Sequence, residues 1–326
     1  MLCCINSTSR SIVIHNLLMA MRICLQACYI NRIIRKGETM KYALNLPNFG
    51  SFGNARIMAE LAALAETNGW DGFFIWDHIN RPFPTDFVDP WVGLAAAALS
   101  TKTILLGTMI TPVPRRRPWK LARETVSLDH LSNGRLIFGA GLGSGRPMEW
   151  GKLGEETEPI ERAKLLDEGL EILKGLWSGK PTTHAGEKYS VEEIQFLPPT
   201  LQKPRIPVWI GGNWPAKPPF RRAARWDGVF PIFKDKTTPV VDQIKACRAY
   251  LASQGDLSPD FQFAHLGEST FNLSPAEASK HTLPFKEAGV SWWMEPLDPD
   301  VYGVAWQEPW PMEKFIQRIE QGPPVC

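Results

Sequence analysis

The stretch that decides the fold runs from Leu128 to Gly145 and reads LDHLSNGRLIFGAGLGSG. A helical pattern ends in it at Asn133-Gly134, the usual signal that stops a helix. The apolar run Leu136-Ile137-Phe138 follows, with the length of a buried strand, and then a glycine-rich loop. Helix, buried strand and loop in this order are typical of an α/β fold with a parallel sheet.

The same alternation continues in both directions from this stretch. Apolar runs of strand length are expected at 42–46, 72–76, 104–110, 136–138, 208–210, 227–230, 261–266 and 290–294. Helical patterns are expected at 55–68, 90–99, 119–131, 160–177, 220–225, 239–251, 275–287 and 310–319. Eight such pairs over about 285 residues favour a (β/α)8 TIM barrel. An open doubly wound sheet is the alternative, but no Gly-x-Gly-x-x-Gly follows the first strand.

Residues 178–206 break this alternation. Four prolines, Pro181, Pro198, Pro199 and Pro204, punctuate a segment without a long periodic run. We interpret it as an insertion after the fourth helix, containing a short hairpin. At the eighth strand, one of the adjacent Trp292 and Trp293 must face the barrel and the other the helices, because side chains alternate along a strand.

The first 39 residues differ in composition from the rest. Five basic residues stand there against the single acid Glu38, a net charge of +4, so the remainder carries +2 − 4 = −2. We predict that residues 1–39 are a misassigned or disordered leader, that Met40 is the functional start, and that residues 40–326 form one barrel. A weak amphipathic membrane or organelle signal is the alternative.

Composition excludes several classes of protein. A net charge of +2 on 326 residues shows no bias toward nucleic acid. Four of the six cysteines lie in the leader, so the body has no disulfide framework and suits a reducing, cytoplasmic compartment. The histidines are scattered and no Cys-x-x-Cys occurs, so no metal site is expected, nor is a membrane partner.

Candidate chemistry lies where strands end, since barrel enzymes build their sites at the carboxyl ends of the strands. Asp77 and His78 follow the second strand, and a carboxylate beside an imidazole can orient a polar ring or move a proton. The alternative is that Asp77 caps a turn and His78 makes a local bond. After the third strand, Thr111 can donate a hydroxyl, and the run 115–117 of three arginines could meet an anion, although at least two of them are expected to be solvated.

Two glycine-rich loops complete the set of candidates. The loop after the fourth strand contains Gly141, Gly143, Ser144 and Arg146, and such a loop can form an anion nest or remain a flexible surface loop. The segment 211–213, Gly-Gly-Asn, follows the fifth strand shortly before a helix, an arrangement that can bind phosphate.

Together these motifs resemble the bacterial luciferase-like flavin monooxygenase superfamily, which includes alkanesulfonate monooxygenases and coenzyme F420-dependent dehydrogenases. The resemblance covers roughly residues 41–232 and is carried by the segments 44–47, 69–78, 107–112, 128–141, 207–212 and 224–228. It implies a (β/α)8 barrel with FMN or the deazaflavin F420 bound without a covalent bond at the strand carboxyl ends.

The resemblance also assigns residues. It implies that Asp77 and His78 contact the ring, and that a bulge with a non-prolyl cis peptide, expected at Thr108–Met109, backs the ring. Residues 141–146 and the segment Gly211, Gly212 and Asn213 would hold the phosphate end. The cofactor-binding residues expected from both lines of reasoning are Thr108, Met109, Thr111, Gly141, Gly143, Ser144, Arg146, Gly211, Gly212 and Asn213.

The loop 144–150, SGRPMEW, departs from the family pattern, which leaves the cofactor open between FMN and F420. The first expectation is a monooxygenase that uses reduced FMN and oxygen to oxygenate a small organic substrate. The alternatives are an F420-dependent dehydrogenase or reductase that transfers hydride, and a flavin-binding protein without turnover. A homodimer and a separate flavin reductase are the other expected partners.

Overall fold

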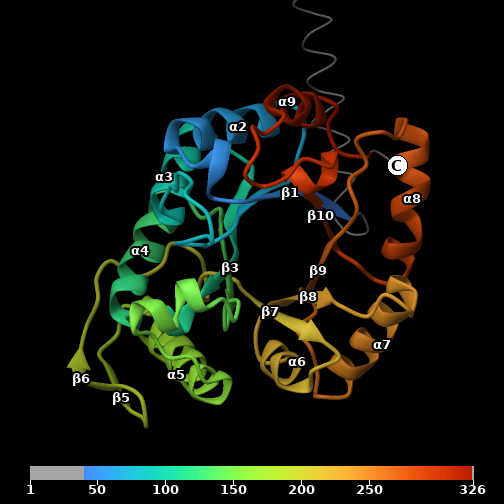
Figure 1. Cartoon of the computed structure of the whole chain (residues 1–326). Helices are drawn as coiled ribbons and strands as arrows, with labels where there is room; N and C mark the ends of the chain where they lie inside the picture. Colours follow the sequence, from blue (N-terminus) through green and yellow to red (C-terminus); the bar gives the residue numbers. More distant parts are fainter. Residues whose placement is uncertain (1–39, 325–326) are drawn as a thin grey trace, which may run out of the picture. The chain divides into compact units, whose positions relative to one another are not determined.

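The computed structural model describes residues 40–324, which form a closed barrel of parallel strands (Figure 1). Around the barrel the strands follow the order β1-β10-β9-β8-β7-β4-β3-β2. They are β1 (Lys41–Leu46), β2 (Gly72–Ile75), β3 (Leu105–Pro112), β4 (Leu136–Gly141), β7 (Val208–Trp214), β8 (Gly228–Phe233), β9 (Gln262–Leu266) and β10 (Trp292–Pro296). The predicted (β/α)8 fold is confirmed, while the predicted leader, 1–39, lies outside the described residues.

Helices alternate with these strands and surround them. They are α2 (Ala55–Thr67), α3 (Pro90–Ser100), α4 (Pro118–Leu131), α5 (Pro159–Trp177), α6 (Lys217–Ala223), α7 (Val240–Ala252), α8 (Pro275–Glu287) and α9 (Met312–Glu320). Among the described residues, no helix combines the length and the apolar character needed to cross a membrane.

Local chemistry sets where the helices begin and end. The Asn54 side chain accepts a hydrogen bond from the Arg56 N–H at the start of α2, and Ser274 forms a capping box with Glu277 at the start of α8. At the predicted stop after α4, Asn133 and the following glycine both have positive φ, 56° and 77°. The capping side chains and the Asn-Gly pair that mark these boundaries in the sequence therefore also form the contacts and turns that end the helices.

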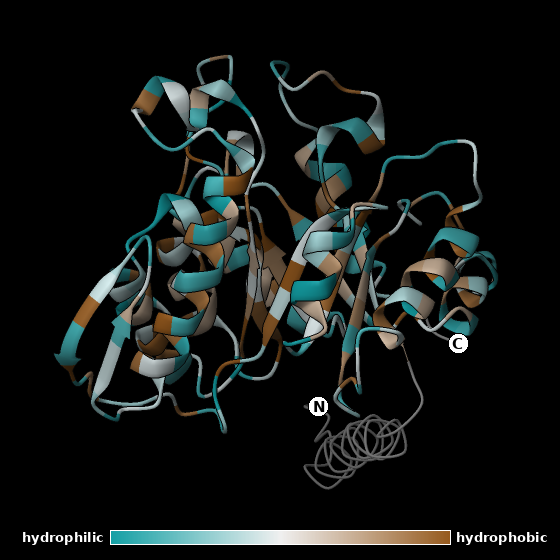
Figure 2. Ribbon diagram, turned by 90° about the horizontal axis from the view of Figure 1, so that it is seen from below, coloured by the Kyte–Doolittle hydropathy of each residue, from teal (hydrophilic) through white to brown (hydrophobic). Residues whose placement is uncertain are grey.

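Aromatic side chains fill the barrel interior. The ring of Trp209 lies 5.6 Å from that of Phe74 and 5.4 Å from that of Trp292, centroid to centroid. As predicted, the next residue points outward: Trp293 packs on Phe285 of α8, with the centroids 5.1 Å apart. Figure 2 shows hydrophobic strands inside and polar helix surfaces outside. Because the barrel is plugged, a ligand must bind at one of its ends.

The predicted insertion is present. Strands β5 (Thr182–Ala185) and β6 (Ser190–Ile194) form an antiparallel hairpin between α5 and β7, at the lower left of Figure 1. Glu168 of α5 accepts hydrogen bonds from the backbone N–H groups of Lys188 and Tyr189, which ties the hairpin to the barrel helix.

Candidate active site

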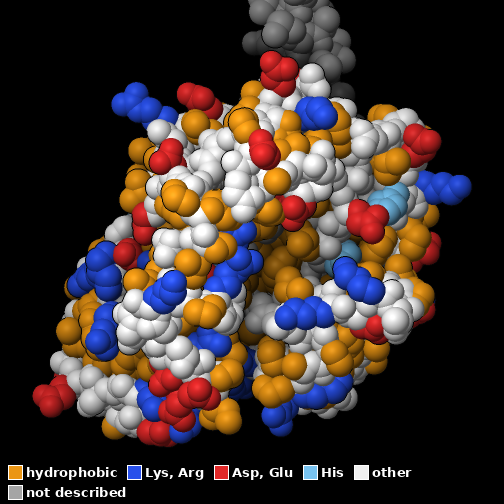
Figure 3. Space-filling view, viewed as in Figure 1, with side chains coloured by type: hydrophobic (Ala, Val, Ile, Leu, Met, Phe, Trp, Pro, Cys, Tyr) orange, Lys and Arg blue, Asp and Glu red, His pale blue; other side chains and the backbone are white. Residues whose placement is uncertain are grey.

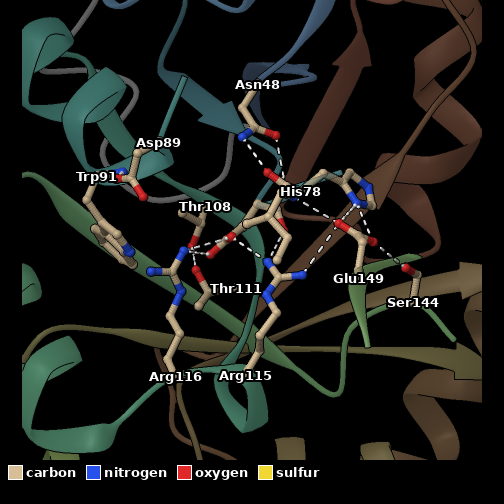
Figure 4. Close-up of polar contacts among 12 residues, drawn as sticks. Asn48, His78, Asp89, Trp91, Thr108, Thr111, Arg115, Arg116, Ser144 and Glu149 are labelled. Atoms are coloured by element: carbon tan, nitrogen blue, oxygen red, sulfur yellow. Dashed lines mark hydrogen bonds and ion pairs between the residues drawn. The ribbon is translucent and has the colours of Figure 1, made fainter. Parts of the chain in front are cut away.

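Three neighbouring strands end at the candidate site. The chain leaves β2 into Asp77 and His78, leaves β3 through the 3-10 turn η2 (Val113–Arg115), and leaves β4 through a loop to the 3-10 turn η3 (Pro147–Glu149). Since β2, β3 and β4 are adjacent in the barrel, residues far apart in sequence meet there (Figure 4). Figure 3 shows a hollow with an apolar floor and Lys or Arg side chains along its rim, in the face that Figure 1 presents.

Asp77 is buried and binds two arginines. Its carboxylate accepts hydrogen bonds from Arg115 Nη2 at 2.9 Å and from Arg116 Nη2 at 2.8 and 2.9 Å. Burial by itself would lower the pKa of Arg116, but the charge of Asp77 and its hydrogen bond raise it. Asp77 therefore neutralises buried cations, so it serves here as the structural anchor of the turn after β3.

The expectation that at least two arginines of the run 115–117 are solvated is wrong. The side chains of Arg115 and Arg116 are only 5% and 16% exposed, and Arg117 alone is exposed. The physical reason is the η2 turn, which directs both side chains back toward the end of β2, where the carboxylate of Asp77 compensates their charge.

His78 is held by Glu149. Its Nδ1 lies 2.9 and 3.0 Å from the two carboxylate oxygens of Glu149, which is 1% exposed. Burial acts to raise the pKa of Glu149, but the hydrogen bond and charge of His78, the Ile79 N–H and the charge of Arg115 together lower it to about 2. Glu149 is thus ionised at neutral pH, and His78 donates from Nδ1.

The rest of the His78 environment fixes the ring in place. Asn48, fully buried, donates to the His78 carbonyl at 2.8 Å and accepts from its N–H at 3.0 Å. The rings of Phe49 and Trp76 stand edge-on to the imidazole, 6.1 and 5.8 Å away. Within residues 40–324 no partner is seen for Nε2, so this nitrogen is available to a ligand as acid or base.

Glu149 and Asn48 are not among the residues predicted from the sequence. Glu149 lies in the loop that departs from the family pattern, and only its position shortly after the glycine run could have singled it out. Ser144, which was predicted, donates from Oγ to Glu149 at 3.0 Å and so belongs to the same network.

The predicted cofactor-binding residues of β3 contact other parts of the protein, the two threonines through hydrogen bonds and the methionine through core packing. Thr111 donates to the Thr108 hydroxyl at 2.9 Å, which donates to the Gly139 carbonyl at 3.2 Å, so both hydroxyls are used inside the protein. Met109 packs in the barrel core. The cis peptide expected at Thr108–Met109 lies one residue later, at Met109–Ile110. The reason is the register of β3 against β4, which shifts between Thr108 and Thr111 and so places the irregularity at residues 109 and 110.

Several of the glycines make room for side chains of the protein itself. A Cβ on Gly141 would overlap Ile110 Cδ1, and one on Gly211 would lie 2.9 Å from the same atom. Gly143 has φ +78°, and a Cβ there would lie 2.7 Å from Trp150. A Cβ on Gly212 would overlap Pro219. Packing accounts for these glycines directly, and their contact with a cofactor remains a prediction.

The two segments predicted to bind phosphate, 141–146 and 211–213, lie side by side, because β4 pairs with β7. The second segment is not a loop, since β7 continues to Trp214 and includes it. Arg146, in the loop after β4, and Asn213, within β7, are both exposed. Arg162 of α5, which was not predicted, is buried and donates to the carbonyls of Leu142 and Ser144 at 3.4 and 3.3 Å. It thereby holds the loop after β4 against the barrel.

The residues present fit a planar ring with polar edges. Asn45, at the end of β1, is 1% exposed; its Oδ1 accepts from Trp76, while its Nδ2 has no partner within the described chain. His78 Nε2, after the neighbouring β2, is a second open polar atom. Buried polar atoms are rarely left without partners, so an unsatisfied donor in a site indicates a ligand acceptor.

Comparison with known proteins finds a family model and curated relatives that match this chain. The family model of the luciferase-like monooxygenases matches residues 40–321. An F420-dependent glucose-6-phosphate dehydrogenase of Microbacterium testaceum is 31% identical over 166 residues, 49% of this chain and 47% of that protein. The oxygenase component of a flavin-dependent trigonelline monooxygenase of Acinetobacter baylyi is 30% identical over 158 residues, 48% of this chain and 43% of that protein. The matched region is therefore about half of each curated relative.

Solved structures with a similar fold include the same kinds of protein as the curated relatives. A solved F420-dependent secondary alcohol dehydrogenase, in complex with an F420–acetone adduct, superimposes with a TM-score of 0.66 at 18% identity, covering 79% of this chain and 93% of that chain. At that identity the likeness concerns the fold alone. The barrel and the match of the family model over 40–321 together establish that this chain belongs to the luciferase-like monooxygenase family.

Proposed function

We propose that this chain is an oxidoreductase that binds a flavin-type cofactor at the carboxyl ends of its barrel strands and uses His78 as acid or base toward the substrate. The observation that carries the proposal is the pair His78–Glu149. Glu149 occupies Nδ1 at 2.9 Å, which leaves Nε2 open at the end of β2. A buried carboxylate that fixes an imidazole in one orientation is an arrangement suited to proton transfer.

Residues at the carboxyl ends of five adjacent strands, β1, β2, β3, β4 and β7, would hold the cofactor and face the substrate. Asn45 would meet a polar atom of the ring, which leaves His78 Nε2 for the substrate, and the apolar surface of Met109 and Ile110 would support its face. The segment 141–146 after β4 and residues 211–213 at the carboxyl end of β7 would receive the phosphate end. When bound, the cofactor supplies redox chemistry, as a hydride acceptor or donor in the case of F420 and as the activator of oxygen in the case of reduced FMN.

Hydride transfer is the reaction that the His78–Glu149 pair supports most directly. Oxidation of an alcohol requires the hydroxyl proton to leave as the hydrogen on carbon departs with its electron pair. His78 Nε2 would take that proton, and Glu149 would stabilise the imidazolium through Nδ1. Similarity to the F420-dependent glucose-6-phosphate dehydrogenase supports this form, with an alcohol or its carbonyl product as substrate.

Oxygen transfer with reduced FMN is the second candidate reaction. It was the reaction expected first from the sequence. Similarity to the trigonelline monooxygenase supports it. That relative is named as an oxygenase component, so in this form we propose a separate flavin reductase as a partner. A cytoplasmic location and a homodimer remain predictions under either form.

The test is to titrate the protein with F420 and with FMN and then to follow turnover of the cofactor that binds. Oxidation of secondary alcohols with reduction of F420 would support hydride transfer, whereas oxygen consumption that requires reduced FMN would support the second candidate. His78→Gln should keep cofactor binding and lose turnover, with His130→Gln, an exposed histidine, as the matched control. Binding of neither cofactor, or full turnover in His78→Gln, would refute the proposal.

A further inference from the structure

The two carboxylate oxygens of Glu149 are held by different parts of the barrel. Oε1 accepts from the Ile79 N–H at 3.0 Å and from Arg115 Nη1 at 3.4 Å, so the chain after β2 and the turn after β3 fix it. Oε2 accepts from Ser144 Oγ at 3.0 Å, and within residues 40–324 its one other contact of this kind is His78 Nδ1 (Figure 4). The orientation of the carboxylate toward the imidazole therefore depends on Ser144.

The hydroxyl of Ser144 reaches Glu149 because the loop after β4 turns back on itself. The two residues are five positions apart in the chain. Gly143 has φ +78°, a conformation that glycine adopts without strain, and a Cβ there would lie 2.7 Å from the ring of Trp150. The loop can thus lie against the residue that follows Glu149, and this brings a donor onto the carboxylate that the same loop carries.

Arg162 of α5 holds this turn in place. It donates to the carbonyls of Leu142 and Ser144 at 3.4 and 3.3 Å. Its guanidinium also lies 4.4 Å from the ring centroid of Trp150. One buried side chain therefore contacts both the backbone of Ser144 and the residue next to Glu149, so the packing of the loop sets the separation of the hydroxyl and the carboxylate.

A serine hydroxyl carries one proton, and in Ser144 that proton is donated to Glu149. The same hydroxyl therefore has no proton left for a phosphate oxygen. An ionised carboxylate 3.0 Å away would also repel an anion. The backbone N–H groups of the loop and the exposed Arg146 remain as donors to the phosphate end of a cofactor. The side chain of Ser144 thus serves the acid–base pair.

We propose that Ser144 is a positioning residue for His78. By holding Oε2, its hydroxyl keeps the carboxylate of Glu149 against Nδ1, and so fixes the direction in which Nε2 points. A proton-transfer group must stay within hydrogen-bond reach of its substrate, so a small displacement of the imidazole lowers the rate. The effect on turnover rests on the proposed function, whereas the hydrogen bond at Nδ1 is present without cofactor.

The test compares the wild type, Ser144→Ala and Ser144→Thr as full chains without cofactor. Proton NMR of histidine-labelled protein observes the Nδ1–H of His78, which is assigned by its absence in His78→Gln. We expect exchange of this proton with water to become about tenfold faster in Ser144→Ala, the effect of losing one hydrogen bond to a charged group. Ser144→Thr keeps the hydroxyl and should restore the wild-type rate. Ser253→Ala is the matched control, because that serine is exposed and bonds a backbone carbonyl.

Turnover supplies the second readout, with whichever cofactor binds. Ser144→Ala should lose about tenfold in kcat, the same hydrogen bond expressed as a rate, with KM and cofactor affinity unchanged, and Ser144→Thr should recover it.

Four results would overturn the proposal. They are unchanged exchange in Ser144→Ala, no recovery in Ser144→Thr, faster exchange with unchanged kcat, and weaker cofactor binding with unchanged exchange. The last of these would assign the hydroxyl to the cofactor. Binding of neither cofactor would refute only the proposed function, because the exchange measurement requires no cofactor.

Discussion

Replacement of Glu149 by Gln tests whether the buried carboxylate holds His78 in place. Gln keeps the size of the side chain but loses its charge, and its single acceptor oxygen cannot replace both carboxylate oxygens, one of which accepts from the Ile79 N–H and the other from Ser144 Oγ. The variant should retain the barrel and the cofactor while the imidazole loses its fixed orientation. Glu155→Gln, a nearby exposed acid, is the matched control.

The expected loss of unfolding free energy in Glu149→Gln follows from the pKa of Glu149, which lies at about 2 instead of 4.5. Because the folded-state pKa is the lower one, the ionised carboxylate contributes stability above pH 4.5 that is lost as the pH falls toward 2. At neutral pH the contribution is roughly 3 kcal/mol, since one pKa unit corresponds to about 1.4 kcal/mol. Glu149→Gln should lose most of this, a decrease in Tm of roughly 5–10 °C.

Two assays check the prediction. Urea unfolding at neutral pH and at pH 3 should show a difference between wild type and Glu149→Gln that is about half as large at pH 3, because that pH lies about one unit above the folded-state pKa of Glu149. Turnover of the variant should fall roughly a hundredfold with cofactor affinity unchanged, the size of a lost acid–base contribution. The reasoning would be refuted if the unfolding free energy of Glu149→Gln at neutral pH lay within about 0.5 kcal/mol of the wild-type value. A difference of that size is what an ordinary surface substitution causes.

Three further perturbations follow from the structure. Asp77→Asn should remove the shared counter-ion of Arg115 and Arg116, whose remaining acids, Glu149 at 3.4 Å and Glu124 at 4.0 Å, are more distant, and destabilise the fold by about 3 kcal/mol, measurable by urea unfolding. Gly141→Ala places a Cβ on the side chain of Ile110 and should cost about 1–3 kcal/mol and weaken cofactor binding, whereas Gly145→Ala, with no atom within 4 Å of its Cβ, should change neither. Burial and a neighbouring acid raise the pKa of Asp298 from 3.8 to about 6, so the stability of the fold falls as the pH rises from 3.8 to about 6, where the unfolded chain ionises this carboxyl and the folded chain still keeps its proton. Asp298→Asn should therefore raise Tm at pH 7.5 and leave it unchanged at pH 3.5; an equal shift at both values would contradict this assignment.

The candidate site could be predicted only in part from the sequence. Asp77 and His78 stand out because they directly follow a buried strand, and the register of β2 does bring them to the end of the barrel. Their partners do not stand out. Arg115 looks like a member of a solvated basic run, and Glu149 lies in an irregular loop, so the pairing across three strands becomes visible only once the barrel closes.

The sequence by itself determines the barrel, because strand and helix periods, helix caps and Asn-Gly or glycine stops are local properties that each segment carries alone. Tertiary structure decides what the strand ends do. It makes Asp77, a predicted catalytic residue, the counter-ion of two arginines, and it uses Gly141 and Gly211 to admit Ile110. It also moves the cis peptide to Met109–Ile110 and buries the guanidinium of Arg81 among aromatic rings, with Nε and Nη1 lacking a hydrogen bond within the described residues. The physical reason is that burial and charge pairing depend on which loops the closed barrel brings together, and no local pattern contains that information.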